Sequence, residues 1–320
     1  AQSFCCPRYA PWGDTPEQRK QNILTSNLLK EAVDTRDYDA AAVYFRTLAQ
    51  EAPSASEATF IRGAQVYSNK VQRAQDLNEK KALLDSLMMI YDLRVQYFPS
   101  SPNYGTAYVL DRKAREYLTF NPSDREGVRK LYKEAIEAGL QSGYAALPDV
   151  ALVYFSNLCD DYKMGEVYPD AVLDEYARLA PIFESDAPGV KEAKTQFDTC
   201  FAGSGAADCE NLEKMFRPRI EAAPEDMELL KQTVSLMSRS QCSSEFFLQI
   251  AEKYYAMEPS AQTAMMLAQG FQERGDFAKS TTYLREAIAA EQDAVQKELL
   301  LVRLSMTELA AKNPTAAAVA

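Results

Sequence analysis

The sequence predicts an all-α solenoid built from antiparallel helix pairs, each stacked on the next. The first observation is a segment, 261–293, in which small and large apolar residues alternate at helical period over a repeat of about 34 residues. The second is a separate segment, 22–53, with the same residue types at the same spacing. The third is composition: 12 of 320 residues are glycine and 47% are hydrophobic, which suits helices better than a sheet with many tight turns. One helix pair cannot bury its own apolar stripe, so we expect neighbouring pairs along the chain.

The residues before the first repeat are expected to form an irregular cap. Segment 1–21 holds the only tryptophan, Trp12, together with several prolines and a glycine, a composition that disfavours a helix. We expect this segment to lie across the first helix pair and to cover its apolar face. The remainder, 22–320, is expected to form about seven helix pairs and an incomplete eighth.

The second to fourth pairs are predicted from apolar stripes and helix stop signals. In the second pair a polar link, 72–80, separates two helices, and Pro99 ends the second. In the third pair Asn121 precedes a proline that breaks the chain, and Ser123 is the expected N-cap, with Glu126 three residues later. The expected helical segments of these pairs are 57–71, 83–95, 108–118, 128–136, 148–162 and 168–183.

The later pairs are separated by prolines about one repeat apart. Pro224 and Pro259 end the fifth and sixth pairs, and Asp208 is the expected N-cap after a glycine-containing link. An eighth pair begins, and Pro314 could start its second helix, but the sequence stops too early to complete it. We therefore expect either a fragment or a short terminal cap. The expected helical segments are 189–201, 209–223, 227–240, 244–258, the repeat 261–293, and 295–310.

Charge and apolar patterning exclude several classes of protein. A net charge of −11 and a pI near 4.8 argue against nucleic-acid binding, and they favour a partner with a neutral or basic surface over an acidic one. No apolar run reaches the roughly 18 residues of a membrane span. The chain begins Ala1-Gln2-Ser3 without methionine, as expected if a signal peptide had been removed. We expect an exported protein, periplasmic or extracellular.

The six cysteines fit an oxidising compartment, and two of them are predicted to pair. Cys209 opens the second helix of the fifth pair, and Cys242 lies in the connection of the sixth, about one repeat later. The intervening helix returns the chain to the same end of the stack, so the two residues should be neighbours. Cys200 is the competing partner for Cys209, and buried free thiols are the alternative. No pairing is predicted for Cys5, Cys6 and Cys159.

The sequence contains no histidine, which removes most common catalytic designs. Ser-His-Asp and Cys-His arrangements, a histidine base and histidine metal ligands are all excluded. The glycines before Asp208 are not followed by the Lys-Ser/Thr of a phosphate loop, and Asp160-Asp161 lacks the spacing of a calcium loop. We predict no catalytic residue, metal or cofactor, and expect a non-enzymatic protein. A carboxylate pair assembled across helices is the remaining enzymatic alternative.

Aromatic and arginine residues on first helices are the candidate ligand contacts. Tyr38, Tyr44, Tyr132 and Tyr283 coincide with positions that pack helix on helix, so we assign those to the core. Others fall where first helices turn toward the concave groove and could contact an extended peptide or a sugar. The alternative is burial between lengthened helices or pairing with acidic residues. The groove candidates are Phe60, Tyr67, Tyr108, Arg112, Arg115, Tyr154 and Asn157.

The helix-pair motifs resemble the tetratricopeptide repeat family along nearly the whole chain after residue 21, most specifically at 22–53 and 261–293. FIRGAQVYSNKV, LLDSLMMIYDLRVQYFP, YVLDRKAREYL and SGAADCENLEKMF are similar to segments of exported tetratricopeptide proteins of the Bacteroidetes. The resemblance implies a right-handed superhelix, an envelope or extracellular location, and a role in holding other macromolecules. It brings no catalytic residues. Pairs two to four depart from the repeat length of the family.

These observations favour a scaffold of the cell envelope that binds a protein or peptide on its concave face. The alternative is a carbohydrate- or nutrient-binding accessory protein of the outer membrane, similar in its repeats to starch-utilisation binding proteins. Groove geometry distinguishes the two, because a long channel favours peptide and an open aromatic platform favours sugar. The sequence assigns neither a named partner nor an oligomeric state.

Overall fold

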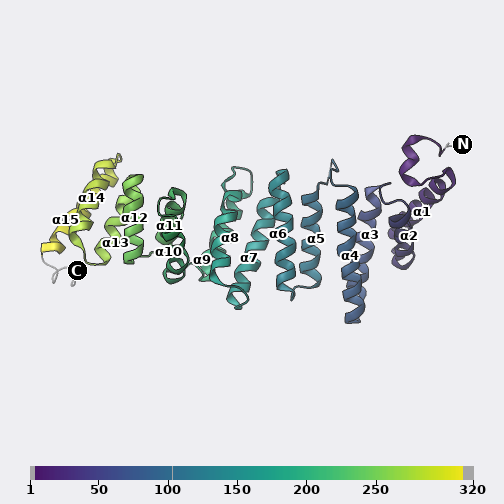
Figure 1. Ribbon diagram of the computed structural model, residues 1–320, viewed down its shortest axis with the longest axis horizontal. Coiled ribbons are helices and arrows are strands. Elements are labelled where there is room, and N and C mark those ends of the chain that lie inside the picture. The colour runs from purple at the N-terminus through teal and green to yellow at the C-terminus, as the bar shows by residue number, and fades with distance from the viewer. Residues whose placement is uncertain (1–3, 103, 313–320) are drawn as a thin grey trace. The chain divides into compact units, whose positions relative to one another are not determined.

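The structure, a computed structural model, describes residues 4–102 and 104–312, and within them it contains helices and no strand beyond one isolated bridge. The first helices in the chain are η1 (Pro7–Trp12), α1 (Pro16–Asp34), α2 (Tyr38–Glu51), α3 (Glu57–Arg73), α4 (Leu77–Tyr97), α5 (Thr106–Phe120), α6 (Arg125–Ser142) and α7 (Leu147–Lys163) (Figure 1). They are followed by α8 (Pro169–Leu179), η2 (Ala180–Glu184), α9 (Val190–Ser204), α10 (Cys209–Ala222), α11 (Met227–Arg239), α12 (Glu245–Met257), α13 (Ala261–Glu273), α14 (Phe277–Ala290) and α15 (Ala294–Lys312).

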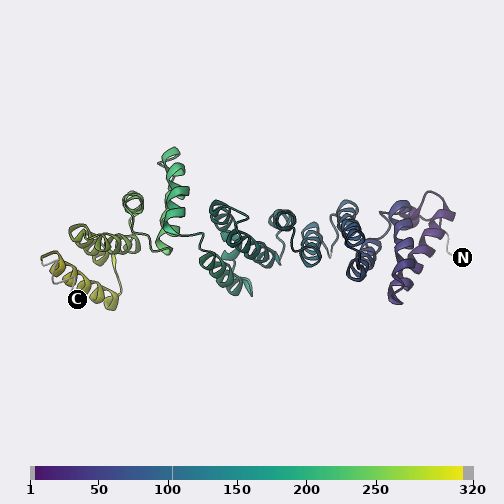
Figure 2. The same ribbon diagram turned by 90° about the horizontal axis from the view of Figure 1, so that it is seen from below.

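The chain divides into two compact units. One comprises residues up to 158 together with 182–194, and the other comprises 159–181 together with the chain from 195 onward. In the first unit each helix from α1 to α6 packs against the next, and Figures 1 and 2 both show these helices side by side. In the second unit α10 to α15 follow the same rule. The prediction of an all-α solenoid of helix pairs is confirmed.

Polar caps define where most helices begin. The side chain of an Asp, Ser or Thr accepts a hydrogen bond from a backbone N–H in the first turn, which satisfies a donor that has no partner inside the helix. Asp208 does this for α10, as the sequence predicted. The capping residues are Thr15, Asp37, Ser56, Asp76, Asp124, Asp208, Asp226, Ser244, Ser260 and Asp276.

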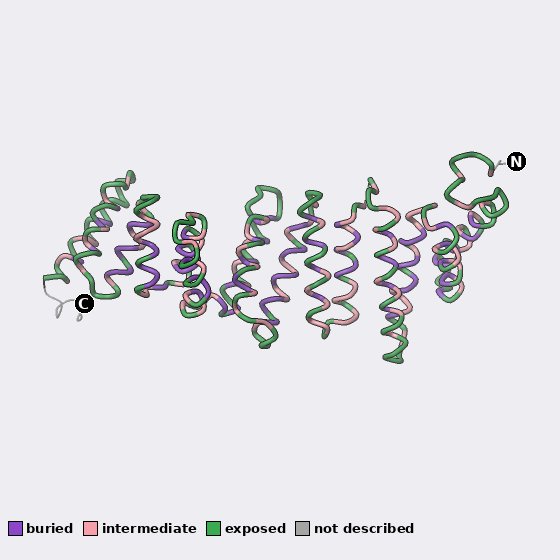
Figure 3. The backbone as a smooth tube through the Cα atoms, in the orientation of Figure 1, coloured by how far each residue is buried: buried purple, intermediate pink, exposed green. Residues whose placement is uncertain are grey.

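The core runs between the helices, where small residues let neighbouring helices approach closely. Buried residues lie on the faces that helices turn toward each other, whereas the projecting end of α4 is exposed (Figure 3). In the first unit a Cβ added to Gly63 would lie 2.4 Å from the Phe45 ring. In the second unit a Cβ added to Gly270 would lie 2.6 Å from the Leu248 side chain. A side chain at Gly63 would force the Phe45 ring to move, because real Cβ atoms do not approach other atoms so closely, whereas at Gly270 only the flexible end of Leu248 would have to shift.

Three local expectations differ from the structure. Helix α1 begins at Pro16, inside the segment expected to be irregular, because proline is accepted in the first turn and Thr15 caps it. Asp124, not Ser123, caps α6 by accepting from the Gly127 amide. Helix α8 stops at its bounds above and continues as the short η2, so the expected helix 168–183 is not one α-helix.

The two ends of the chain contain the expected terminal features in part. The Trp12 side chain packs against the core of the first helix pair, and its carbonyl accepts a hydrogen bond of 2.7 Å from the Asn22 side chain. At the other end α15 is the first helix of the expected eighth pair. Pro314, expected to begin its second helix, lies outside the described residues, as do Ala1-Gln2-Ser3.

Candidate functional site

Two hollows lie side by side along α3 in the first unit. The first has a volume of about 600 Å³ and is lined by α1, the α1–α2 turn and α3; we call it the turn hollow. The second, of about 280 Å³, is lined by α3, α4 and α5; we call it the α5 hollow. Gln65 and Asn69 line both. Gln65 and Asn69 thus stand between two adjacent hollows lined by the first helices α1, α3 and α5 of three consecutive pairs, and we call the two hollows together the α3 trough.

The lining of the α3 trough comes from a polar stripe on α3. Arg62, Gln65, Asn69 and Arg73 recur every three or four residues, so they share one face of the helix. Their amide and guanidinium groups provide hydrogen-bond donors and acceptors for a ligand backbone or polar side chain. The further polar lining residues are Lys30, Asp34 and Arg36 in the turn hollow, and Ser68, Tyr91, Arg94, Arg112 and Glu116 in the α5 hollow.

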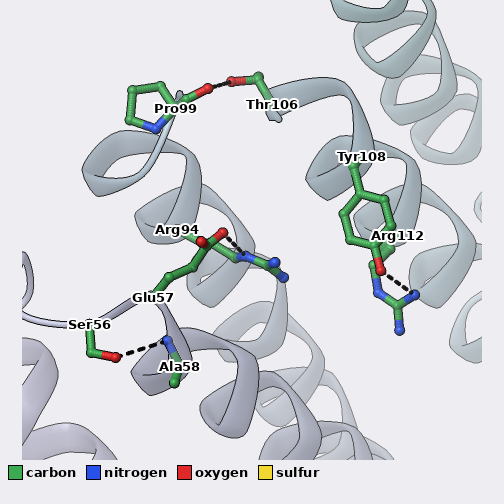
Figure 4. Close-up of polar contacts among 8 residues, drawn as sticks. All are labelled: Ser56, Glu57, Ala58, Arg94, Pro99, Thr106, Tyr108 and Arg112. Carbon is green, nitrogen blue, oxygen red and sulfur yellow. Dashed lines mark hydrogen bonds and ion pairs between the residues drawn. The ribbon is translucent and has the colours of Figure 1, made fainter. Parts of the chain in front are cut away.

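Arg94 anchors the floor of the α5 hollow. Its Nε donates to the Glu57 carboxylate at 3.1 Å, and the Arg94 side chain is only 5% exposed (Figure 4). The guanidinium also lies over the Tyr104 ring, 5.2 Å from the centroid. An ion pair buried to this degree fixes the position of the arginine, since breaking it would leave a buried charge without a partner.

Glu116 is the carboxylate of the α5 hollow. The Ser68 hydroxyl donates to it at 3.2 Å. Burial raises the pKa of this carboxyl, against the opposing effects of the Ser68 hydrogen bond and of Arg112. Burial, and secondarily the charge of Glu116, raises the pKa of the neighbouring Tyr91 hydroxyl to about 12. The α5 hollow thus offers the Glu116 carboxylate as an acceptor beside the exposed guanidinium of Arg112.

Tyr108 and Arg112 are the predicted groove residues that the structure brings to the α3 trough. The Tyr108 hydroxyl accepts a hydrogen bond of 3.2 Å from Arg112, as Figure 4 shows, and the guanidinium lies 5.4 Å from the ring centroid. Arg112 lines the α5 hollow directly. Tyr108 is half-buried beside Tyr104, with ring centroids 4.9 Å apart. The tyrosine pair and Arg112 form a rim next to the trough.

Phe60, Tyr67 and Tyr154 were predicted as ligand contacts, and the structure places them in the core. Their exposures are 0%, 7% and 1%, so no ligand could contact them without opening the helix packing. Phe60 stacks on the Tyr97 ring of α4, with the planes 4° apart. Phe60 and Tyr67 also lie near the Phe45 ring of α2, and burying the three large aromatic side chains removes apolar area from water. In the structure these three residues therefore have a packing role.

Arg115 and Asn157 are held by other residues of the chain. Arg115 Nε donates to Asp111 at 2.6 Å, and Asp111 also accepts from the Tyr144 hydroxyl at 3.0 Å. The Asn157 side-chain oxygen accepts from Arg125 at 2.7 Å. Neither Arg115 nor Asn157 lines the α3 trough. Arg115 is paired with an acidic residue of its own helix, an alternative that the sequence left open, and Asn157 joins α7 to α6.

Sequence reasoning missed the polar residues of α3, which line more of the trough than the predicted residues do. Aromatic and arginine side chains are the usual ligand contacts, and this expectation led to Phe60 and Tyr67. The available signal was the polar spacing of Arg62, Gln65 and Asn69, which is helical and falls on another face of the same helix.

The second unit contains the predicted disulfide. Cys209 and Cys242 are bonded, with Cα atoms 5.6 Å apart, so the expected pairing is found and Cys200 is not the partner of Cys209. The remaining described cysteines are free thiols: Cys5, Cys6, Cys159 and Cys200. Burial raises the pKa of Cys159 to about 12, which keeps this thiol protonated and unreactive.

Membrane-spanning helices and metal-binding clusters are both absent from the described residues. No helix among them is long and apolar enough to cross a membrane. No group of three or more Cys, Asp or Glu side chains in the described ranges is placed to hold a metal ion.

Comparison with known proteins gives likenesses among solved structures. No family model matches the sequence. No curated protein matches it either. A tetratricopeptide repeat protein from Parabacteroides merdae is 11% identical with a TM-score of 0.33, covering 90% of this chain and 99% of its own. The tetratricopeptide domain of P58(IPK) is 12% identical with a TM-score of 0.28, covering 92% of this chain and 99% of its own.

These likenesses are too distant to support an argument, so the assignment rests on the chain itself. Its consecutive helix pairs pack in order within each unit, and the segments 22–53 and 261–293 carry the repeat spacing. The described part of the protein is therefore an all-α solenoid of antiparallel helix pairs.

Proposed function

We propose that this protein is a non-enzymatic scaffold that holds an extended peptide or protein segment in the α3 trough. The trough lies on the face made by first helices, which is the concave face of the expected solenoid. The observation that carries the proposal is the sharing of Gln65 and Asn69 between two adjacent hollows. A ligand that fills both hollows has to be elongated, as a peptide is.

The chemistry of the α3 trough supports a peptide ligand. An extended peptide presents a backbone N–H and C=O at every residue, and these need hydrogen-bond partners when they leave water. Gln65, Asn69 and Ser68 supply such partners along α3, while Arg112 adds a charged donor. No step of chemistry is needed for this function.

We propose an exported location, in the periplasm or outside the cell. The Cys209–Cys242 disulfide supports this, since structural disulfides persist in oxidising compartments. Mass spectrometry of the protein purified from fractionated cells would test the location; recovery in the cytoplasm with Cys209 and Cys242 reduced would contradict it.

The ligand proposal is tested by selecting peptides from a random display library on the immobilised protein and measuring their affinities by calorimetry. We expect the triple substitution Gln65→Ala, Asn69→Ala and Arg112→Ala to weaken the selected peptides at least tenfold. Lys214→Ala is the matched control, because this side chain is 72% exposed on α10 and distant in the sequence from the trough. Unchanged affinity in the triple variant would refute the trough as the peptide site.

A carbohydrate ligand is the second candidate, and the Tyr104–Tyr108 ring pair is the observation that favours it. Aromatic faces at the rim of a hollow can stack on sugar rings. Glycan-array binding that is lost in Tyr108→Ala, and kept in the triple variant of α3 and α5, would favour the sugar over the peptide.

A further inference from the structure

The turn that ends α1 has an arginine where three of the four other described turns of this kind have glycine. Arg36 has φ 60°, and the Asp37 amide donates to the Ala32 carbonyl at 2.8 Å, which closes the helix. The same left-handed residue, followed by the same hydrogen bond, occurs after four other described helices. The left-handed residues that follow those four helices are Gly143, Gly165, Gln241 and Gly275. Glycine adopts this conformation without strain, so an arginine at Arg36 is retained at a cost to folding.

Arg36 contributes its side chain to the turn hollow, where other cations gather. Lys30 lies on α1, Arg62 and Arg73 lie on α3, and all of them line the same hollow as Arg36. Arg73 is held over the Tyr38 ring, 4.9 Å from its centroid. Within the described part of the chain Lys30, Arg36 and Arg62 form no ion pair and no side-chain hydrogen bond. These positive charges are therefore available to a ligand.

The acidic groups near the turn hollow do not neutralise these cations. Asp34 is the single carboxylate in its lining. On the adjacent surface Asp37 caps α2, and Asp39 pairs with Lys70 at 2.6 Å, so both are engaged within the chain. The lining thus carries a positive charge, although the whole chain carries −11.

Stabilisation of helix C-termini accounts for some of these cations but not for Arg36. Lys70 and Arg73 lie in the last turn of α3, where a positive charge interacts favourably with the helix dipole. The last turn of α1 contains no basic residue. Arg36 follows the end of α1, and the Asp37 amide already satisfies a terminal carbonyl there. A glycine at this position would close the helix equally well.

We propose that the turn hollow binds side-chain carboxylates of an acidic segment within a partner protein, with Arg36, Arg62 and Lys30 as the contacting cations. This inference rests on the proposed function and specifies the chemistry at one end of the α3 trough. Guanidinium groups bind carboxylates through paired hydrogen bonds, which explains the use of arginine at two of these positions. The net charge of the chain favours partners with a basic or neutral surface, whereas this hollow would favour an acidic one.

The test uses fluorescence anisotropy with labelled peptides blocked at both ends, so that only side chains carry charge. One peptide alternates glutamate with glycine, and its matched partner has glutamine in place of glutamate. We expect the glutamate peptide to bind the full protein at least tenfold more tightly than the glutamine peptide at low salt. We also expect that preference to fall when ionic strength rises from about 50 mM to about 300 mM.

Arg36→Gly separates an effect on binding from an effect on folding, because it should weaken peptide binding while it raises the stability of the fold. We expect this variant to bind the glutamate peptide about tenfold more weakly, the loss of one charge-assisted contact. Its melting temperature should rise, because glycine relieves the left-handed backbone. Gln241→Gly is the control: it relieves the same backbone conformation in the second unit, so its melting temperature should also rise while peptide binding stays unchanged.

The outcomes distinguish this inference from the proposed function. Equal binding of the two peptides, or unchanged glutamate-peptide affinity in Arg36→Gly, would overturn the acidic-segment site. Displacement of the glutamate peptide by inorganic phosphate at equal concentration would also overturn the acidic-segment site. The turn hollow would then bind small anions in general and would not be specific for side-chain carboxylates. If the affinity of the library-selected peptides still depended on Gln65, Asn69 and Arg112 in those cases, the proposed peptide-scaffold function would be unaffected.

Discussion

Removal of the Cys209–Cys242 disulfide should destabilise the second unit and leave the first unit unchanged. The bond closes a loop with a sequence separation of 33. The chain-entropy relation for a loop of this length gives about 4 kcal/mol of stabilisation, through restriction of the unfolded chain. With a urea dependence of about 2 kcal/mol/M, the unfolding midpoint of the second unit should fall by about 2 M.

Two optical signals separate the units in a single urea titration. Trp12 is the only tryptophan, and it packs against the first helix pair, so its fluorescence reports unfolding of the first unit. Far-UV circular dichroism reports the helices of both units. In the double variant Cys209→Ser, Cys242→Ser we expect part of the dichroism to be lost at lower urea, while the Trp12 transition keeps its midpoint.

Two results would refute this reasoning. If the Trp12 transition moved as far as the dichroism, the two units would unfold as one cooperative body. If neither signal moved, the cross-link would not restrict the unfolded chain as the entropy relation requires. Wild-type protein treated with a reductant should match the double variant, which controls for effects of the serine substitutions themselves.

Three further predictions concern the first unit. Gly63→Ala should lower its unfolding free energy by about 1–3 kcal/mol, measured from the Trp12 midpoint in urea, because the added Cβ overlaps the Phe45 ring. Arg94→Met should lower it by about 3 kcal/mol in the same assay, since Glu57 would keep a largely buried charge without its partner. Raising the pH from about 10 to about 12 should progressively lower the unfolding free energy, because Tyr91, with a pKa raised to about 12, keeps its proton in the fold while the unfolded chain loses it.

Each of these predictions has a matched control. Gly105→Ala should leave stability nearly unchanged, because nothing lies within 4 Å of the added Cβ. Adding Glu57→Gln to Arg94→Met should recover part of the loss, and the absence of any recovery would contradict the buried ion pair. Tyr91→Phe should reduce the decline above pH 10; an identical decline would assign it to the other tyrosines whose pKa is raised.

Much of the fold could be predicted from the sequence because helix packing is encoded by local spacing. In α13 and α14 the small residues Ala264, Ala268 and Ala287 are almost fully buried, as a repeat of helix pairs requires. The disulfide was predictable for the same reason, since positions one repeat apart lie at the same end of a stack. The start of α1 was missed because proline was weighed as a helix breaker and not as a first-turn residue.

The candidate site was less predictable because it depends on which face of a helix meets its partner. Phe60 and Tyr67 are one heptad apart and share a stripe, but periodicity alone does not say whether that stripe faces a neighbouring helix or solvent. Asp111 lies four residues before Arg115 on the same helix, so that ion pair could have been predicted from local spacing, whereas Arg125 lies 32 residues before Asn157 and no local pattern links the two. Among the predicted groove residues, Arg112 lines the α5 hollow and Tyr108 lies beside it, and their contact with a ligand stays a prediction.

The left-handed turns have a consequence for how such a protein could change its specificity. Hydrogen bonds across the turn set its path, and the residue at its tip can be Gly275, Gln241 or Arg36 without altering that path. A new side chain can therefore be introduced at these connections at an expense of about 1 kcal/mol, with the helix packing intact. Asparagine tolerates this conformation best after glycine, so it is the natural first substitution for redesigning what each connection recognises.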